Sequence, residues 1–175
     1  MTIRRLAAAD CTKLNAFLTT NFTNDAASGG ALPAATAAFL QAQLAVAPTW
    51  IDIVSGKIRG VLGPAMMNGV REVQHDPQVI RTFVYFNRLI VDYAIYTASR
   101  ATALQIAHGL TLFAANEIQA GGSPPDDIIV EGLLTSRGAS WCRLLTFAEE
   151  PRGPEGRWVC PFAEIWARLN AVVIA

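Results

Sequence analysis

The chain has 175 residues, with 14 Lys and Arg balanced by 14 Asp and Glu. This length predicts one domain with a single hydrophobic core over residues 1–175, of which residues 163–175 form a C-terminal helical extension. The zero net charge, without any basic run, argues against nucleic acid or an anionic membrane surface as a partner. Three widely spaced cysteines predict neither a disulfide scaffold nor a zinc site, and they suit the reducing cytoplasm.

The composition is unusually apolar, with 52% hydrophobic and only 16% charged residues. Typical domains carry about 25% charged residues. Two interpretations stay open: an alanine-rich soluble domain, or a subunit that buries additional surface in an assembly. The apolar stretches are interrupted by polar residues before they reach the length of a membrane span, and no export signal is visible.

The first third of the chain predicts a strand and two helices. Residues 2–6 are typical of a short strand, and Asp10 is placed to cap a helix that carries apolar residues at helical spacing. Residues 21–32 are predicted to form a loop. Pro33 suits the first turn of a second helix, which ends before Pro48.

A hairpin and a long strand follow. Residues 50–54 and 57–62 flank Ser55 and Gly56, so they predict an antiparallel hairpin with a tight turn. The two glycines in residues 60–64 indicate a bend or a bulge. Residues 82–91, rich in β-branched and aromatic side chains, predict one interior strand.

The second half predicts alternating helices and strands. Residues 98–119 have helical periodicity, and the Gly-Gly-Ser-Pro-Pro run at 121–125 ends this helix. A strand at 128–130, a helix at 137–145 capped by Ser136, and strands from Phe147 and at 158–160 come next. Residues 163–172 form the last predicted helix. The four tryptophans are predicted to be anchors of the core or of an interface, and both histidines to serve packing or the surface.

This order of elements, together with three local phrases, resembles the GNAT acetyltransferases over most of the chain. Residues 3–10 are similar to the first strand of that family running into its first helix. Residues 89–92 resemble the fourth strand, which leads to a cofactor loop with the pattern Arg/Gln, two residues, Gly, one residue, Gly/Ala. Residues 137–147 resemble the terminal phrase of the family. The resemblance implies an α/β (α+β) fold with a mixed, mostly antiparallel central sheet flanked by helices.

The resemblance also implies a site for acetyl-CoA in the splayed region between the fourth and fifth strands. Backbone amides at the start of the following helix would meet its pyrophosphate, where glycine permits close approach. Here the three pattern positions are Tyr96, Ser99 and Ala101. The implied cofactor-binding residues are Val91, Tyr96, Thr97, Ala98, Ser99, Arg100, Ala101 and Ser136.

The catalytic positions of the family are replaced in this chain. Cys142 stands where a tyrosine commonly protonates the departing thiolate of coenzyme A, and Thr146 stands where the family has glycine. Cys142 could donate a proton or simply pack as a small hydrophobic residue. Asp92 and Glu131 are the candidate general bases, with a water chain as the alternative. No metal is implied.

Three functions therefore remain open at the level of sequence. The chain could be an acyl-CoA-dependent N-acetyltransferase acting on an amine. It could be a non-catalytic structural or assembly protein, as are acetyltransferase-like proteins in particles of short-tailed bacteriophages, and would then need no cofactor and could reside in a virus particle. It could also be a regulatory module that binds acetyl-CoA without turnover. Protein partners or a homo-oligomer are expected for the assembly function.

Overall fold

The computed structural model describes residues 2–22, 24–25, 30–31, 37–44, 48–64, 79–86, 89–97, 99–131, 136–152 and 155–172. The strands are β1 (Thr2–Arg5), β2 (Asn24–Asp25), β3 (Gly30–Ala31), β4 (Trp50–Val54), β5 (Lys57–Pro64), β6 (Val79–Phe86), β7 (Leu89–Tyr96), β8 (Asp127–Glu131), β9 (Ala148–Arg152) and β10 (Glu155–Pro161). The helices are α1 (Cys11–Phe22), α2 (Ala37–Leu44), α3 (Arg100–Ala120), α4 (Ser136–Leu144) and α5 (Phe162–Ala171), with a 3-10 turn, η1 (Ala8–Asp10), before α1.

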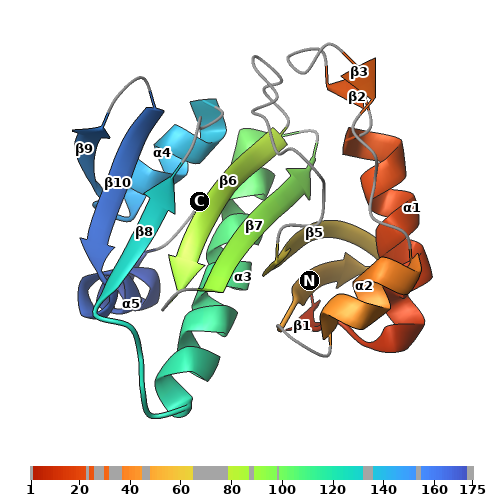
Figure 1. Cartoon of the computed structure of the whole chain (residues 1–175), viewed down its shortest axis with the longest axis horizontal. Coiled ribbons are helices and arrows are strands. Elements are labelled where there is room, and N and C mark those ends of the chain that lie inside the picture. The colour runs from red at the N-terminus through yellow and green to blue at the C-terminus, as the bar shows by residue number, and fades with distance from the viewer. Residues whose placement is uncertain are drawn as a thin grey trace.

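One eight-stranded sheet organises the fold, in the order β1-β4-β5-β7-β6-β8-β10-β9, and β2 and β3 form a separate two-stranded ribbon (Figure 1). Each pairing that the described strands make is antiparallel. The predicted class, α and β elements around a largely antiparallel sheet, is confirmed. Within the part of the chain that the structure describes, no helix is both long and apolar enough to cross a membrane.

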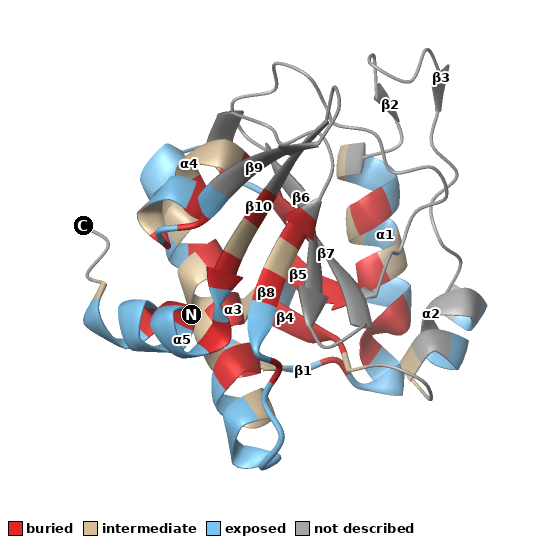
Figure 2. Cartoon of the chain, turned by 60° about the vertical axis from the view of Figure 1, so that its left-hand side comes forward, coloured by how far each residue is buried: buried red, intermediate tan, exposed pale blue. Residues whose placement is uncertain are grey.

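Two hydrophobic clusters lie on opposite faces of the sheet. The larger joins α3, α4 and α5 to the sheet and includes Tyr93 and Ile95 of β7. The smaller joins α1 to β4, β5 and β7 and includes Ala94, which lies between those two residues in sequence. Because alternate residues of a strand point to opposite faces, β7 contributes to both clusters, and its residues Tyr93, Ala94 and Ile95 are buried. Figure 2 shows the buried positions along the strands and on the inner faces of the helices.

A β-bulge in the hairpin of β4 and β5 changes which face of the sheet the residues of β5 point to on either side of it. The register passes from Ile53 opposite Ile58 to Asp52 opposite Gly60, so Arg59 is the extra residue. As a result Ile58 packs in the α1 cluster, whereas a Cβ atom on Gly60 would meet Ile106 of α3. The predicted hairpin is confirmed. The bend or bulge predicted within residues 60–64 is wrong, because these residues pair in regular register with β7 and the bulge lies at Arg59.

The prediction of one strand over residues 82–91 is wrong. The structure has two antiparallel strands here, β6 and β7, paired from Val79 opposite Tyr96 to Phe86 opposite Leu89. Apolar and β-branched residues run through both strands because both lie in the interior of the sheet, and this hid the boundary. The polar pair Asn87 and Arg88, which lies outside the described residues, was the only sequence signal of a turn.

The N-terminal segment is fixed by Asp10 in a different way from the predicted cap. Its carboxylate accepts hydrogen bonds from the Arg4 guanidinium at 2.7 and 2.9 Å and from the Ala7 amide at 3.1 Å. The Arg4 contact lowers the pKa of Asp10. Asp10 therefore closes the short turn between β1 and α1. The predicted start of the second helix at Pro33 lies outside the described residues, and α2 runs over Ala37–Leu44.

The C-terminal helix packs on its own domain. Phe162, Ile165 and Leu169 of α5 are buried in the larger cluster. The backbone carbonyl of Leu169 lies 2.7 Å from His108 Nε2 of α3, so this histidine has a packing and tethering function, as predicted. Trp166 is 37% exposed and its indole N–H donates to Asn116.

Candidate functional site

The strands that flank the expected acetyl-CoA site are separated by another strand. β6 pairs antiparallel with β7 along its whole length and with β8 over four residue pairs. Consequently β7 and β8, which α3 connects, run parallel to each other with β6 between them (Figure 1). Phe83 of β6 lies opposite Asp92 on one side and opposite Glu131 on the other. The space between β7 and β8 is therefore occupied by β6, which is hydrogen-bonded to both strands.

The first turn of α3 holds the remaining residues of the expected cofactor loop. Ser99 is the N-cap: its Oγ accepts a hydrogen bond from the Thr102 amide at 3.1 Å and lies 2.7 Å from the Thr102 hydroxyl. The Ser99 amide in turn donates to the Thr97 hydroxyl at 3.2 Å. A serine in this position satisfies one of the free amides that a helix N-terminus would offer to an anion.

This turn is connected to α4. The Arg100 guanidinium donates to Ser140 Oγ at 3.1 Å, so the start of α3 lies beside the middle of α4. Arg100 and Ala101 are exposed. Tyr96, the last residue of β7, is 37% exposed, at the position where the resembled family often has Arg or Gln.

For the other predicted cofactor-binding residues, only their positions in the fold can be described. Val91 lies in β7 opposite Val84 of β6, so it belongs to the sheet. Ser136 is the first residue of α4 and not a residue before the helix. Ala98 lies outside the described residues.

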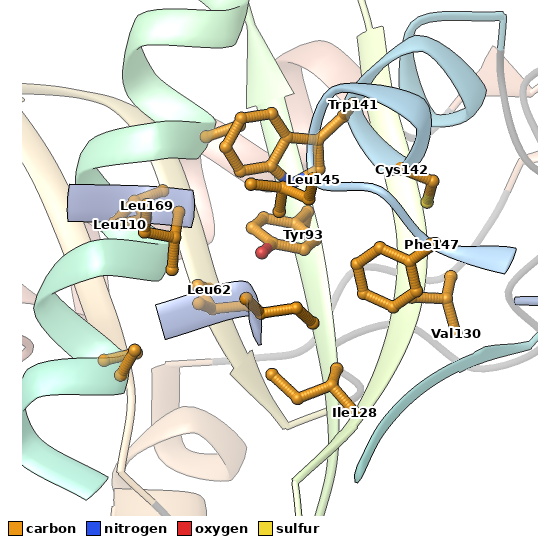
Figure 3. Close-up of a cluster of buried hydrophobic side chains, with 14 of the residues drawn as sticks. Leu62, Tyr93, Leu110, Ile128, Val130, Trp141, Cys142, Leu145, Phe147 and Leu169 are labelled. Atoms are coloured by element: carbon orange, nitrogen blue, oxygen red, sulfur yellow. The ribbon is translucent and has the colours of Figure 1, made fainter. Parts of the chain in front are cut away.

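Cys142 is a core residue in the structure. Its side chain lies with those of Tyr93, Val130 and Phe147 in the larger cluster, as Figure 3 shows, and the residue is 1% exposed. Burial raises the pKa of the Cys142 thiol from 9.0 to about 12. Proton transfer from such a group to an ordinary thiolate is uphill by roughly 3 pKa units, about 4 kcal/mol. The geometry supports the packing interpretation of this cysteine.

The three predicted catalytic residues are not brought together. Asp92 and Glu131 lie in one row across β6, with two interstrand spacings, about 10 Å, between their backbones. Their sequence neighbours Tyr93 and Val130 belong to the cluster that contains Cys142. By strand alternation, positions 92 and 131 belong to the opposite face of the sheet from Cys142.

A backbone outlier lies at the end of α4, where the resembled family has glycine. Thr146 has φ +64°, a left-handed conformation that is unusual for a β-branched residue. The Thr146 amide donates to the Arg143 carbonyl and the Phe147 amide to the Cys142 carbonyl, both at 3.1 Å. This is the pair of bonds of a Schellman motif, which places glycine at the left-handed position. The threonine therefore carries local strain.

Replacing Thr146 by glycine is expected to raise the free energy of unfolding by about 0.5–1 kcal/mol, because relief of the left-handed strain exceeds the added entropy of the unfolded chain. Urea denaturation measures this change. Thr146→Ala is the matched control, since it removes the hydroxyl but keeps a Cβ atom at positive φ, and it should give no gain. Equal effects of the two substitutions would contradict the assignment of strain to the backbone.

The buried thiol also predicts a loss of stability in alkaline solution. Because the pKa of Cys142 is higher in the folded state, the folded chain holds its proton where the unfolded chain releases it. The contribution is fully present below pH 9 and is lost as pH rises towards 12, with about 1 kcal/mol lost by pH 10. Urea denaturation at pH 8 and pH 10 measures this fall. Cys142→Ala should show a smaller fall, and an unchanged fall would contradict this origin.

Sequence reasoning missed the buried carboxylate of this fold. Asp52 of β4 is 0% exposed and forms an ion pair with Arg59 across the hairpin at 2.7 Å. Its position in an apolar strand, seven residues before an arginine, was a weak signal. Tyr93 was missed as well; its hydroxyl bonds Thr111 of α3, and burial raises its pKa to about 12. Both residues are enclosed within the fold.

Comparisons with known proteins give a likeness of fold. No protein-family model matches the sequence, and no curated protein matches it. A solved structure described as the crystal structure of smu.2055 from Streptococcus mutans UA159 is similar, with a TM-score of 0.58 and 12% sequence identity. The match covers 93% of this chain and 99% of that one. Among the described residues, no group of three or more His, Cys, Asp or Glu could hold a metal ion.

Proposed function

We propose that this chain is a GNAT-like protein that does not catalyse acetyl transfer and acts as a structural or assembly component. The observation that carries the proposal is the position of β6. The resemblance assigns the region between the fourth and fifth strands to acetyl-CoA, and in this fold β6 lies between β7 and β8 and pairs with both.

The chemistry of the remaining positions supports the same proposal. Cys142, in the place of the acid, is enclosed in the core and holds its proton strongly. Positions 92 and 131, those of the candidate bases, alternate along their strands with Tyr93 and Val130, which belong to the cluster of Cys142. An N-acetyltransferase needs a proton donor and an acceptor that both reach the reacting atoms. The apolar composition favours a partner protein or further copies of the chain, as in a virus particle.

A second candidate is a module that binds acetyl-CoA without turnover. The exposed first turn of α3, with Arg100 at its first position, favours this function because a helix N-terminus and a cation both attract phosphate. The Ser99 cap opposes it by occupying the Thr102 amide. The two candidates differ in whether acetyl-CoA binds at all.

Isothermal titration with acetyl-CoA separates them. We expect no saturable binding up to about 1 mM, a free energy weaker than roughly −4 kcal/mol. The Tyr96→Arg, Ser99→Gly double variant, which restores two family residues, is the matched control. It should also show no saturable binding of acetyl-CoA, because neither change removes β6. Saturable binding that strengthens in the double variant would overturn the proposal in favour of a ligand-binding function.

Two further measurements test the proposed structural or assembly function. Hydrogen exchange of the β6 and β7 amides should be slow and unchanged by 1 mM acetyl-CoA, since these amides pair with each other. Analytical ultracentrifugation should show a defined oligomer. A monomer whose β6 amides change protection when acetyl-CoA is added would contradict an assembly function.

A further inference from the structure

The ion pair of the first hairpin joins the buried Asp52 to the partly exposed Arg59 and has an unusual geometry. Both Nε and Nη2 of Arg59 contact the same oxygen of Asp52, Oδ2, at 2.8 and 2.7 Å. A guanidinium more often shares its two donors between the two carboxylate oxygens. Here Oδ1 of Asp52 is fully buried and accepts no hydrogen bond from the described residues.

The bulge lies at the same place and explains how the pair forms. Arg59 is the extra residue of β5, skipped between the pairs Ile53–Ile58 and Asp52–Gly60. The extra residue of a bulge loses its partner in the ladder, which frees backbone polar groups close to Asp52. Two independent observations, an orphan carboxylate oxygen and an interrupted ladder, therefore coincide beneath α3.

The surroundings restrict what Oδ1 can bind. Asp52 is 0% exposed, so a large ligand has no route to it. Its charge is already balanced by Arg59, so a metal ion would leave an uncompensated positive charge in the core. An unbonded buried polar atom is costly, which favours a small neutral donor. Buried waters typically make about three hydrogen bonds to such otherwise unsatisfied groups.

We propose that Asp52 Oδ1 and the backbone of the bulge form an internal binding site for one water molecule. The water donates one hydrogen bond to Oδ1 and makes a second contact to a backbone group of Arg59 or Ile53. It completes the polar network that the bulge opens and links β4 to β5 where direct pairing stops. This site is separate from the cofactor region and does not depend on the proposed function.

A high-resolution crystal structure of the full chain tests the proposal. We expect a water peak about 2.7–3.2 Å from Oδ1 with a second polar contact to the bulge backbone. A direct protein donor on Oδ1, or ordered side chains without such a peak, would overturn it.

Solution NMR provides the second measurement. A long-lived water should give a nuclear Overhauser effect to the amide of residue 53 or 59. The Asp52→Leu, Arg59→Met double variant removes both charges together, so no uncompensated charge stays behind. In that variant the signal should be lost while the remaining spectrum is retained. If the signal persists there, the water is not held by Asp52; if the variant does not fold, the wild-type density decides.

Discussion

Trp141→Ala is expected to lower the free energy of unfolding by about 4 kcal/mol, a large share of the stability of a domain of this size. Trp141 is 2% exposed and joins α4 to the larger cluster. Its ring and that of His108 pack in a T-shaped arrangement with 6.4 Å between their centroids, and the buried Tyr93 belongs to the same cluster. Truncation would leave a cavity beside the buried Tyr93, whose hydroxyl keeps its bond to Thr111. Urea denaturation followed by circular dichroism measures the loss.

Trp166→Ala is the matched control, because it removes the same side chain from an exposed site. Its side chain donates one hydrogen bond to Asn116 at 2.9 Å and is 37% exposed, against 2% for Trp141. We expect a smaller loss, about 1–2 kcal/mol. Similar losses for the two tryptophans would mean that α4 is not packed against the sheet as described.

Gly60→Ala should be the second most destabilising change, at about 2–3 kcal/mol. A Cβ atom on Gly60 would lie 2.5 Å from Cγ2 of Ile106 and 3.2 Å from Cγ1 of Ile95. Cγ2 is attached directly to the branched Cβ of Ile106, so no rotation of a long side chain can relieve the clash. The midpoint of chemical denaturation measures the effect.

The double variant Gly60→Ala, Ile106→Ala identifies the cause. Ile106→Ala alone should destabilise through its cavity, but in its background Gly60→Ala should cost less than 1 kcal/mol, because the new methyl group enters the vacated volume. Additive losses would contradict a close approach of β5 to α3. The result would also test the bulge, since the unbulged register places a different residue under Ile106.

The inserted strand connects the fold to the proposed function. Among the described residues, β6 pairs with β7 along its whole length and with β8 from Phe83 to Phe86, so the strand edges that β7 and β8 present to each other along residues 83–86 are paired to β6. Unpaired edges are what extended ligands and added strands use for backbone hydrogen bonding. In this chain β6 forms those backbone hydrogen bonds between β7 and β8, which agrees with the proposed structural or assembly function.

Local chemistry let the sequence predict most elements on its own. The Ser55 and Gly56 turn, the helical periodicity that became α3, and the amphipathic α5 all depend on interactions within a few residues. These features appear in sequence because turns, caps and helix faces are set by short-range backbone and side-chain preferences. The resemblance to the GNAT family, and not local chemistry, marked Thr146 as a position where glycine is usual, and the positive φ of Thr146 agrees with it.

Tertiary structure alone decided the features on which the proposed function rests. Residues 79–86 and 89–96 are mostly apolar, so the composition does not tell one long strand from two paired strands. Which strands they pair with across the sheet decides between them. The separation of Cys142 from Asp92 and Glu131, and the burial of Asp52 beside Arg59, likewise follow from strand order and from one bulge. Pairing partners distant in sequence leave no local signature, because a strand buried on both faces has the same composition wherever it is placed in the sheet.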